Sequence, residues 1–227
     1  MVISSLFFHD NVLYWIYSHA EDSNVIYCWN KQGCLLPMVM YGIVISVLIS
    51  VFVSEEFDDG FIKNKIIANN NRREIYLTGL LSNLIASAIV YLITALFTLI
   101  VSYFLFSINI SILDYVSYFI FGIFIMLVFV GIFYLISIAV GKKSKAIIIN
   151  MGLAFIMLIA ALIVNGMLMA DNNLFMEFLY NLNPYGQIAQ LTSMKSLDMR
   201  ESIKIDAFLF IIFTVCGIKY FNKKDIN

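Results

Sequence analysis

Charge and proline are both scarce in this sequence. Only 13% of the 227 residues are charged and only two are proline, whereas soluble domains contain about 25% charged residues. The net charge is −1, so no basic surface for nucleic acid is predicted. With two prolines and eleven glycines, the chain has little material for a long linker. We therefore expect one domain that is neither a typical soluble protein nor a nucleic-acid-binding one.

Motifs for catalysis and nucleotide binding are missing as well. The sequence contains no GxxxxGK[ST], HExxH, GxSxG or CxxC pattern, so it has no P-loop and no recognisable catalytic set. Its two histidines, His9 and His19, lie near the N-terminus, where we expect solvated imidazoles rather than metal ligands. No catalytic residue, metal site or cofactor is predicted on this chain.

Cysteine is rare, with only Cys28, Cys34 and Cys216 present. The first two are close enough in sequence to form a disulfide if they lie in an oxidising compartment, and two free thiols are the alternative. Cys216 falls within an apolar run, where we expect it to pack as a small hydrophobic residue.

Apolar residues, in contrast, are abundant. They make up 62% of the chain, and the mean hydropathy is +0.91, which predicts an all-α integral membrane protein. A spanning helix needs about 20 apolar residues, and five runs approach or exceed that length. They predict a transmembrane domain over 35–227, preceded by an outer segment over 1–34. The five predicted spans cover about 35–53, 75–106, 115–140, 146–170 and 207–221.

Length and polarity vary among these runs. The second is too long for one crossing, so its beginning is expected to extend into water as a helix. The fifth is short and contains Lys219, whose ammonium group can reach the interface. The polar exceptions near span centres are Asn83, Asn150 and Asn165. We expect these amides to hydrogen-bond between helices rather than to line a path, and the lack of buried charge argues against an ion-coupled carrier.

The distribution of Lys and Arg predicts which side faces the cytoplasm. The denser group lies directly against the spans, which is typical of the cytoplasmic side. Residues 55–74, the "GKKSK" turn at 141–145 and the C-terminus are therefore placed there, and 1–34, 107–114 and 171–206 are placed outside. The cytoplasmic group comprises Lys63, Lys65, Arg72, Arg73, Lys142, Lys143, Lys145, Lys223 and Lys224.

The outer segments carry two further patterns. Val2–Phe8 is apolar but too short to span or to act as a signal peptide, and we favour a missing first span over a chain that simply begins outside. Within 171–206, apolar residues at helical spacing and the "NPYG" turn at 183–186 predict two short amphipathic helices on the outer leaflet. An ordinary surface hairpin is the alternative.

The most polar long stretch is "EEFDDGFIKNKIIANNNRRE", residues 55–74, with five acids and four bases. Gly60 permits a sharp turn, after which "FIKNKIIA" predicts a short helix. Asn71 followed by Glu74 resembles a capping box for the next span. Apolar residues in a polar segment predict a surface for a protein partner, with a solvated loop as the alternative.

This stretch resembles the signature of the permease subunits of ABC type-2 exporters, in which "E(F/Y)xxGTIRNKL" precedes "R…IYLSK". Phe61 stands where Thr is common, and Lys63 stands where Arg is common. "NPYGQ" at 183–187 and "FNKKDI" at 221–226 are also typical of that family, so the resemblance covers about 35–227. The matching positions are Glu56, Phe57, Gly60, Phe61, Ile62, Lys63, Asn64, Lys65, Arg72, Ile75, Tyr76 and Leu77.

The resemblance implies a type-2 permease bundle of six spans, of which this chain lacks the first, with short outer helices before the last span. It also implies a pair of identical or paralogous permeases in the bacterial cell membrane, above two cytoplasmic ABC ATPase subunits that hold ATP and Mg. A coupling helix over about Phe57–Ala68 would contact the ATPase. The implied contact residues are Glu56, Phe57, Asp58, Gly60, Phe61, Ile62, Lys63, Asn64, Lys65, Ile66, Arg72 and Arg73, and the outer motif is Asn183, Pro184, Tyr185 and Gly186.

The function that this resemblance implies is export driven by ATP hydrolysis on a separate subunit, so the chain itself is not an enzyme. The expected cargo is amphipathic or hydrophobic, such as a peptide, a bacteriocin or a drug. The alternative is a non-transporting immunity or sensor protein that binds a toxin or peptide through 171–206. A membrane enzyme is a third interpretation, for which no catalytic set is visible.

Overall fold

The described part of the chain is entirely helical. The computed structural model describes residues 36–68, 71–106, 112–170, 174–192 and 199–224. The predictions on the two histidines, the Cys28–Cys34 pair and the missing first span lie outside these residues. The helices are α3 (Leu36–Asp58), α4 (Phe61–Ile67), α5 (Arg72–Phe106), α6 (Ile112–Val140), α7 (Lys143–Ala170), α8 (Leu174–Leu182), α9 (Pro184–Thr192) and α10 (Met199–Lys223).

Four of the described helices are long and apolar enough to cross a membrane. They coincide with the first four predicted spans. The fifth predicted span lies within α10, which has 25 residues but is not among these four and begins at Met199 rather than at Ala207. The four candidate spans are Met40–Asp58, Arg72–Phe97, Phe119–Val140 and Lys143–Leu168.

The second predicted span is one uninterrupted helix. α5 contains 35 residues, which corresponds to roughly 52 Å at 1.5 Å per residue. The hydrocarbon core of a bilayer is only about 30 Å thick. α5 is therefore longer than one crossing requires, whereas the extension of its beginning into water stays a prediction.

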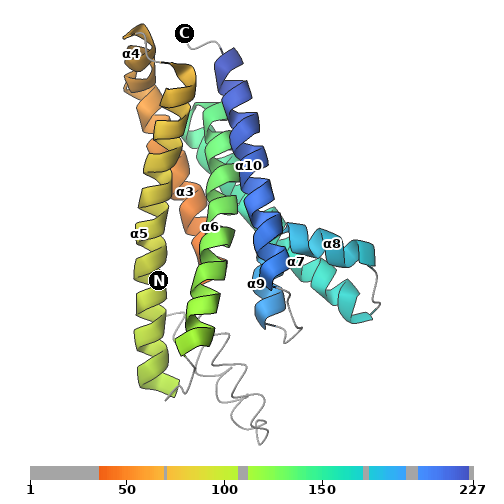
Figure 1. Ribbon diagram of the computed structural model, residues 1–227. Coiled ribbons are helices and arrows are strands. Elements are labelled where there is room, and N and C mark those ends of the chain that lie inside the picture. Colours follow the sequence, from red (N-terminus) through yellow and green to blue (C-terminus); the bar gives the residue numbers. More distant parts are fainter. Residues whose placement is uncertain (1–35, 69–70, 107–111, 171–173, 193–198, 225–227) are drawn as a thin grey trace, which may run out of the picture.

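α6 lies at the centre of the helical bundle. Figure 1 shows α5, α6 and α10 side by side, with α3 and α7 behind them and α8 and α9 set to one side at one end. α6 packs against α3, α5, α7 and α10. Its residues Phe121, Ile125, Phe129 and Phe133 recur every four positions and are all fully buried. This spacing places them on one face of the helix, which forms the middle of the core.

α3 approaches its neighbours closely because one of its faces is made of small residues. Ser46, Ser50 and Ser54 follow each other at intervals of four and are buried. Gly42 continues the same row, and a Cβ atom there would clash with the Tyr185 hydroxyl group of α9. Small side chains let helix backbones come together in a membrane, where packing rather than water drives association.

The outward faces of α5 and α7 are apolar. On α5, Leu77, Leu81, Ile85 and Ile89 recur every four residues, with exposed fractions between 46% and 58%. α7 likewise exposes several isoleucines to the outside. Such faces suit contact with lipid or with another membrane helix. The prediction that Cys216 packs inside is wrong, because its side chain is exposed on α10.

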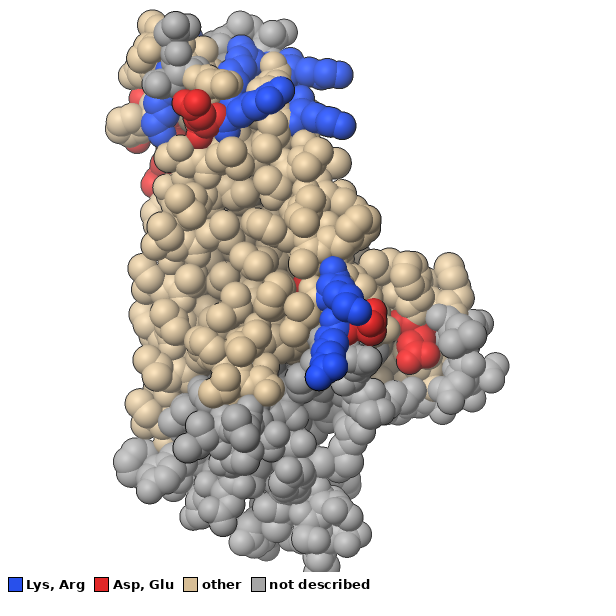
Figure 2. All heavy atoms as spheres, in the orientation of Figure 1, with Lys and Arg blue, Asp and Glu red and all other residues tan. Residues whose placement is uncertain are grey.

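Charged side chains gather at two levels of the molecule (Figure 2). One group lies at the end that carries α4 and the last turn of α10, a smaller group lies beside α8 and the first turns of α10, and the band between them is uncharged on this face. This is the pattern of a transmembrane domain with two polar boundaries. We call the first group the basic end; it contains Lys63, Lys65, Arg72, Arg73, Lys142, Lys143, Lys145, Lys223 and Lys224.

Candidate functional site

The chain reverses direction between α3 and α4 at Gly60. This residue has φ 71° and ψ 10°, a left-handed conformation that glycine adopts without the penalty of a Cβ atom. Its N–H donates to the carbonyl oxygen of Phe57 at 3.1 Å. The sequence placed Phe57 and Asp58 in the coupling helix, but they form the last turn of α3 because the reversal comes only at Gly60.

α4 is a seven-residue helix with one buried anchor. Ile62 is only 3% exposed and belongs to the core cluster. Lys63 and Asn64 are exposed, and Ile67 is 74% exposed. A helix this short is not stable alone, so its position depends on the burial of Ile62 and on packing against α3 and α5. The predicted short helix with a mixed apolar and basic surface is confirmed.

The beginning of α5 is capped by Asn71. Its side-chain oxygen accepts a hydrogen bond from the Arg73 N–H at 3.2 Å, which satisfies one of the free donors of the first turn. In the described part of the chain, the Glu74 carboxylate makes no return bond to Asn71. Half of the predicted capping box is therefore formed.

Arg72 connects the start of α5 to the end of α10. Its guanidinium group donates to the carbonyl oxygens of Phe221 at 3.5 Å, Asn222 at 3.2 Å and Lys224 at 2.8 Å. Carbonyl groups in the last turn of a helix have few N–H donors within the helix, so they are free to accept hydrogen bonds from side chains. Positive charge is also favourable at this end of a helix. The Arg72 side chain thus holds two helix ends together, whereas Arg73 is exposed.

Lys224 ties two further helix ends, those of α3 and α6, to the end of α10. Its ammonium group donates to the carbonyl oxygen of Ile138 at 2.6 Å, at the end of α6. The same group lies 4.6 Å from the centre of the Phe57 ring on α3, a favourable cation–π distance. Partial burial lowers the pKa of Lys224 below its usual value. At the basic end, α3, α6 and α10 therefore share one side chain.

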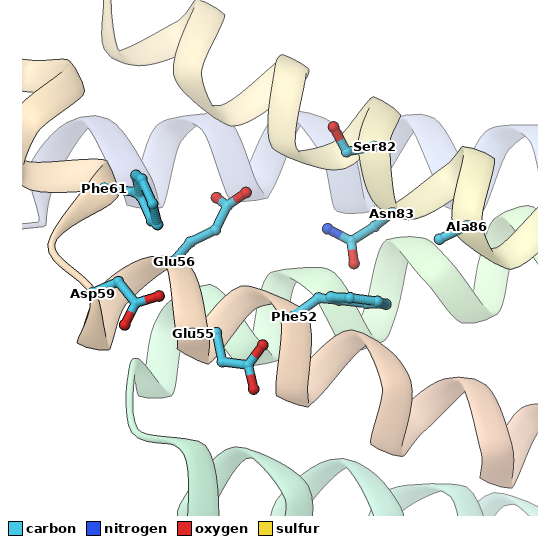
Figure 3. Close-up of a pocket in the computed structure, with 8 residues that line it drawn as sticks. All are labelled: Phe52, Glu55, Glu56, Asp59, Phe61, Ser82, Asn83 and Ala86. Atoms are coloured by element: carbon cyan, nitrogen blue, oxygen red, sulfur yellow. The ribbon is translucent and has the colours of Figure 1, made fainter.

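A pocket of about 320 Å³ opens between α3, α4 and α5 at the basic end (Figure 3). The sequence had assigned only some of its residues to a functional surface, and none to a cavity. Three acidic side chains, two from the end of α3 and one from the residue after it, reach the pocket together with two aromatic rings and one amide. These six are Glu55, Glu56, Asp59, Phe52, Phe61 and Asn83.

Asn83 does not bridge two helices as the sequence predicted. Its side-chain NH₂ group donates to the carbonyl oxygen of Gly79 at 2.8 Å, four residues earlier in α5. Asn83 is only 5% exposed, yet its Oδ1 atom has no hydrogen-bond partner in the described part of the chain. A buried acceptor without a donor costs about 1–3 kcal/mol, so this amide is a candidate ligand group.

Asn150 on α7, in contrast, joins three helices as predicted. Its NH₂ group lies 2.8 Å from the Ser50 hydroxyl of α3, 2.8 Å from the Ser137 hydroxyl of α6 and 3.1 Å from the Phe133 carbonyl oxygen. The side chain is fully buried. The third amide, Asn165, is half-buried. Asn150 is therefore a structural link in the bundle.

A buried acid at the opposite end was not predicted from the sequence. Asp206 lies in α10, one residue before the predicted fifth span, and is fully buried. Its Oδ1 atom accepts a hydrogen bond from the Gln187 side-chain NH₂ group of α9 at 2.8 Å. Burial raises the pKa of Asp206 to about 7, against the lowering effect of the Gln187 bond. In the sequence, Asp206 is a single Asp next to an apolar run. Such a residue cannot be told apart from a charge at the membrane interface without the structure.

The outer motif lies between α8 and α9, the two short helices that the sequence predicted. Asn183 separates them, and its Oδ1 atom accepts a hydrogen bond from the Tyr185 N–H at 3.1 Å. Its NH₂ group donates to the Met157 carbonyl oxygen of α7 at 2.7 Å. Pro184, Tyr185 and Gly186 form the first turn of α9. The predicted turn is therefore confined to Asn183, and the rest is helical because Pro is favourable at a first helical position.

The helices and their charge boundaries define the class of this chain as a helical membrane protein. Residues 1–227 match the model of a family described as "Protein of unknown function (DUF2705)", and the chain belongs to that family. A comparison with curated proteins found no match.

Proposed function

We propose that this chain is the membrane subunit of an ATP-driven exporter and that α4 is its contact with a cytoplasmic ATPase. One observation carries the proposal. α4 stands at the basic end with Ile62 anchored in the core, while Lys63, Asn64 and Ile67 point away from it. The density of Lys and Arg at that end supports a cytoplasmic position for it.

The contacts around α4 support a role in transmitting movement. α4 packs against α3 and α5, and the side chains of Arg72 and Lys224 connect those helices to α6 and α10. A partner that displaced α4 would therefore move several helix ends together. Such a partner changes the conformation only if it contacts α4 differently in two states. ATP and Mg would be held by the partner.

The exposed apolar faces support the remaining parts of the proposal. α5 and α7 leave large hydrophobic side chains outside the bundle, and these faces are available to lipid and to a second permease copy, identical or paralogous. The uncharged band between the two polar levels (Figure 2) suits an amphipathic or hydrophobic cargo. The bacterial cell membrane is the corresponding location, with the C-terminus in the cytoplasm.

The proposal is tested by co-expressing the full chain with an ABC ATPase encoded beside it. We expect Ile67→Asp to reduce co-purification of the ATPase at least tenfold, because a carboxylate replaces an exposed apolar contact. Ser144→Asp is the matched control, since Ser144 is exposed at the same end but lies on α7. Equal recovery of the ATPase with Ile67→Asp and with the unaltered chain would contradict the proposal.

A second function is favoured by α8. This helix exposes Phe175 by 62% and Phe178 by 54%, and it projects from the side of the bundle (Figure 1). An aromatic face of this kind suits an immunity or sensor protein that binds a peptide without transporting it. Peptide binding that is lost with Phe178→Asp and is unaffected by Ile67→Asp would favour this second function.

A further inference from the structure

We propose that the pocket between α3, α4 and α5 binds an organic cation, an ammonium or guanidinium group attached to an apolar body. If the chain is an exporter, this cation would be its cargo, and that role rests on the proposed function. The binding itself does not depend on the proposed function. The pocket encloses about 320 Å³, within the range of small-molecule sites, which is about 300–1,000 Å³.

The acidic side chains of the pocket have unequal roles. Glu55 is already paired with Lys143 of α7, with 2.7 Å between its Oε1 atom and the ammonium nitrogen. In the described part of the chain, neither Glu56 nor Asp59 forms an ion pair. Two carboxylates thus face the same cavity without a cation paired to either of them in the described part of the chain. Their combined field attracts cations and repels anions.

Asn83 supplies an independent indication that a ligand is required. Its NH₂ group is turned toward Gly79, which directs the Oδ1 atom into the space between α5 and α3 (Figure 3). That oxygen is buried and has no donor in the described part of the chain. A guanidinium or ammonium group carries several N–H donors and can bind this amide oxygen and a carboxylate together.

Two aromatic rings specify the apolar part of the ligand. Phe52 comes from α3 and Phe61 from α4, and both line the pocket. Their exposed fractions of 49% and 56% leave ring surface free for a ligand. Aromatic faces attract cations within about 6 Å and also cover hydrocarbon. Ala86 and the exposed α5 row that includes Ile85 continue this apolar surface away from the carboxylates.

The side chains fit an organic cation better than a metal ion. Among the described residues, no group of three or more His, Cys, Asp or Glu side chains is arranged to hold a metal. The cavity is also much larger than one bare ion requires, and aromatic rings contribute nothing to metal coordination. A cation with directional donors and an apolar body uses all of these groups.

The test measures binding to the full chain, purified without any ATPase in a non-ionic detergent. Benzylguanidinium is the probe, and benzylurea is its neutral counterpart of the same shape. We expect saturable binding of benzylguanidinium by calorimetry and no detectable binding of benzylurea. Glu56→Gln should raise the Kd about tenfold, which corresponds to about 1.4 kcal/mol. Asn83→Ala should also weaken binding.

Glu74→Gln is the matched control, because Glu74 is exposed at the basic end and does not line the pocket. It should leave the Kd within about twofold. Equal binding of benzylguanidinium and benzylurea, or equal effects of Glu56→Gln and Glu74→Gln, would overturn the proposal. The comparison of the two probes needs no variant, so it holds even if Glu56→Gln unfolds.

Two additional measurements are needed. One distinguishes a lipid from a soluble source of the cation, and the other tests the pocket separately from the α4 contact. If phosphatidylethanolamine displaces benzylguanidinium, the natural cation is a lipid ammonium; if it does not, the natural cation is a soluble molecule. Binding by a chain whose Ile67→Asp variant still recruits the ATPase would support the pocket and reject α4 as the contact. No binding of benzylguanidinium, together with ATPase recruitment that is lost only in Ile67→Asp, would reject the pocket and support α4 as the contact.

Discussion

At the scale of single residues, Asp206 has the most unusual environment. It is fully buried and bonded to Gln187, while its Oδ2 atom has no partner among the described residues. Burial favours the neutral form, which agrees with a pKa near 7. The acid form is favoured because it avoids burying a negative charge that no cation among the described residues neutralises.

This environment predicts a pH-dependent stability. An unfolded Asp ionises near pH 3.9, whereas Asp206 in the folded chain keeps its proton up to about pH 7. Between those values the folded state binds the extra proton, so the free energy of unfolding should fall as the pH rises from about 4 to 7 and then level off. The measurement is thermal unfolding in detergent across this range.

The control for this prediction removes the titrating group without changing its shape. Asp206→Asn should abolish the fall in stability between pH 4 and 7, because an amide does not ionise. Glu177→Gln, at an exposed acid of α8, should retain it. An Asp206→Asn variant with the original pH profile would show that another group is responsible.

At the scale of helices, the arrangement of the basic end depends on how α5 and α10 meet. Arg72 provides the link, through three carbonyl oxygens of the last turn of α10 and the residue after it. Hydrogen bonds from a charged group contribute about 1.5–3 kcal/mol. Without them the last turn of α10 would fray more readily, because the carbonyl groups at a helix end lack most of their partners within the helix.

We therefore expect Arg72→Gln to increase amide hydrogen exchange in the last two turns of α10 by about tenfold or more. Arg73→Gln is the matched control, since Arg73 is adjacent and exposed. It should leave the exchange rates unchanged. Similar protection of α10 in both variants would mean that core packing, and not the Arg72 bonds, holds this helix end.

At the scale of the whole molecule, the two polar levels predict an orientation in the membrane. Ser144 lies at the basic end and Glu177 lies on α8 at the other, and both are exposed. In a chain whose native cysteines have been replaced, Ser144→Cys should react with a membrane-impermeant maleimide only in inside-out vesicles. Glu177→Cys should react in intact cells. The opposite labelling would reverse the topology and place α4 outside.

Much of the architecture followed from local patterns. Four of the five predicted spans coincide with the four candidate spans, because hydrocarbon requires long uncharged helices whatever their neighbours are. Gly60 and the amphipathic spacing after it predicted α4, and the apolar spacing after position 173 predicted α8 and α9. Each of these features depends on residues a few positions apart.

The sequence by itself determined the helical membrane class, the spans and the polar segment at one end of them. Only the tertiary structure decided which polar residues act together. It placed Asn83 beside Glu56 and Asp59 in one pocket, paired Asp206 with Gln187 and left Asn150 as a purely structural link. These outcomes depend on which helix faces meet. Packing between segments far apart in the chain sets those contacts, and the spacing of residues along one helix does not predict them.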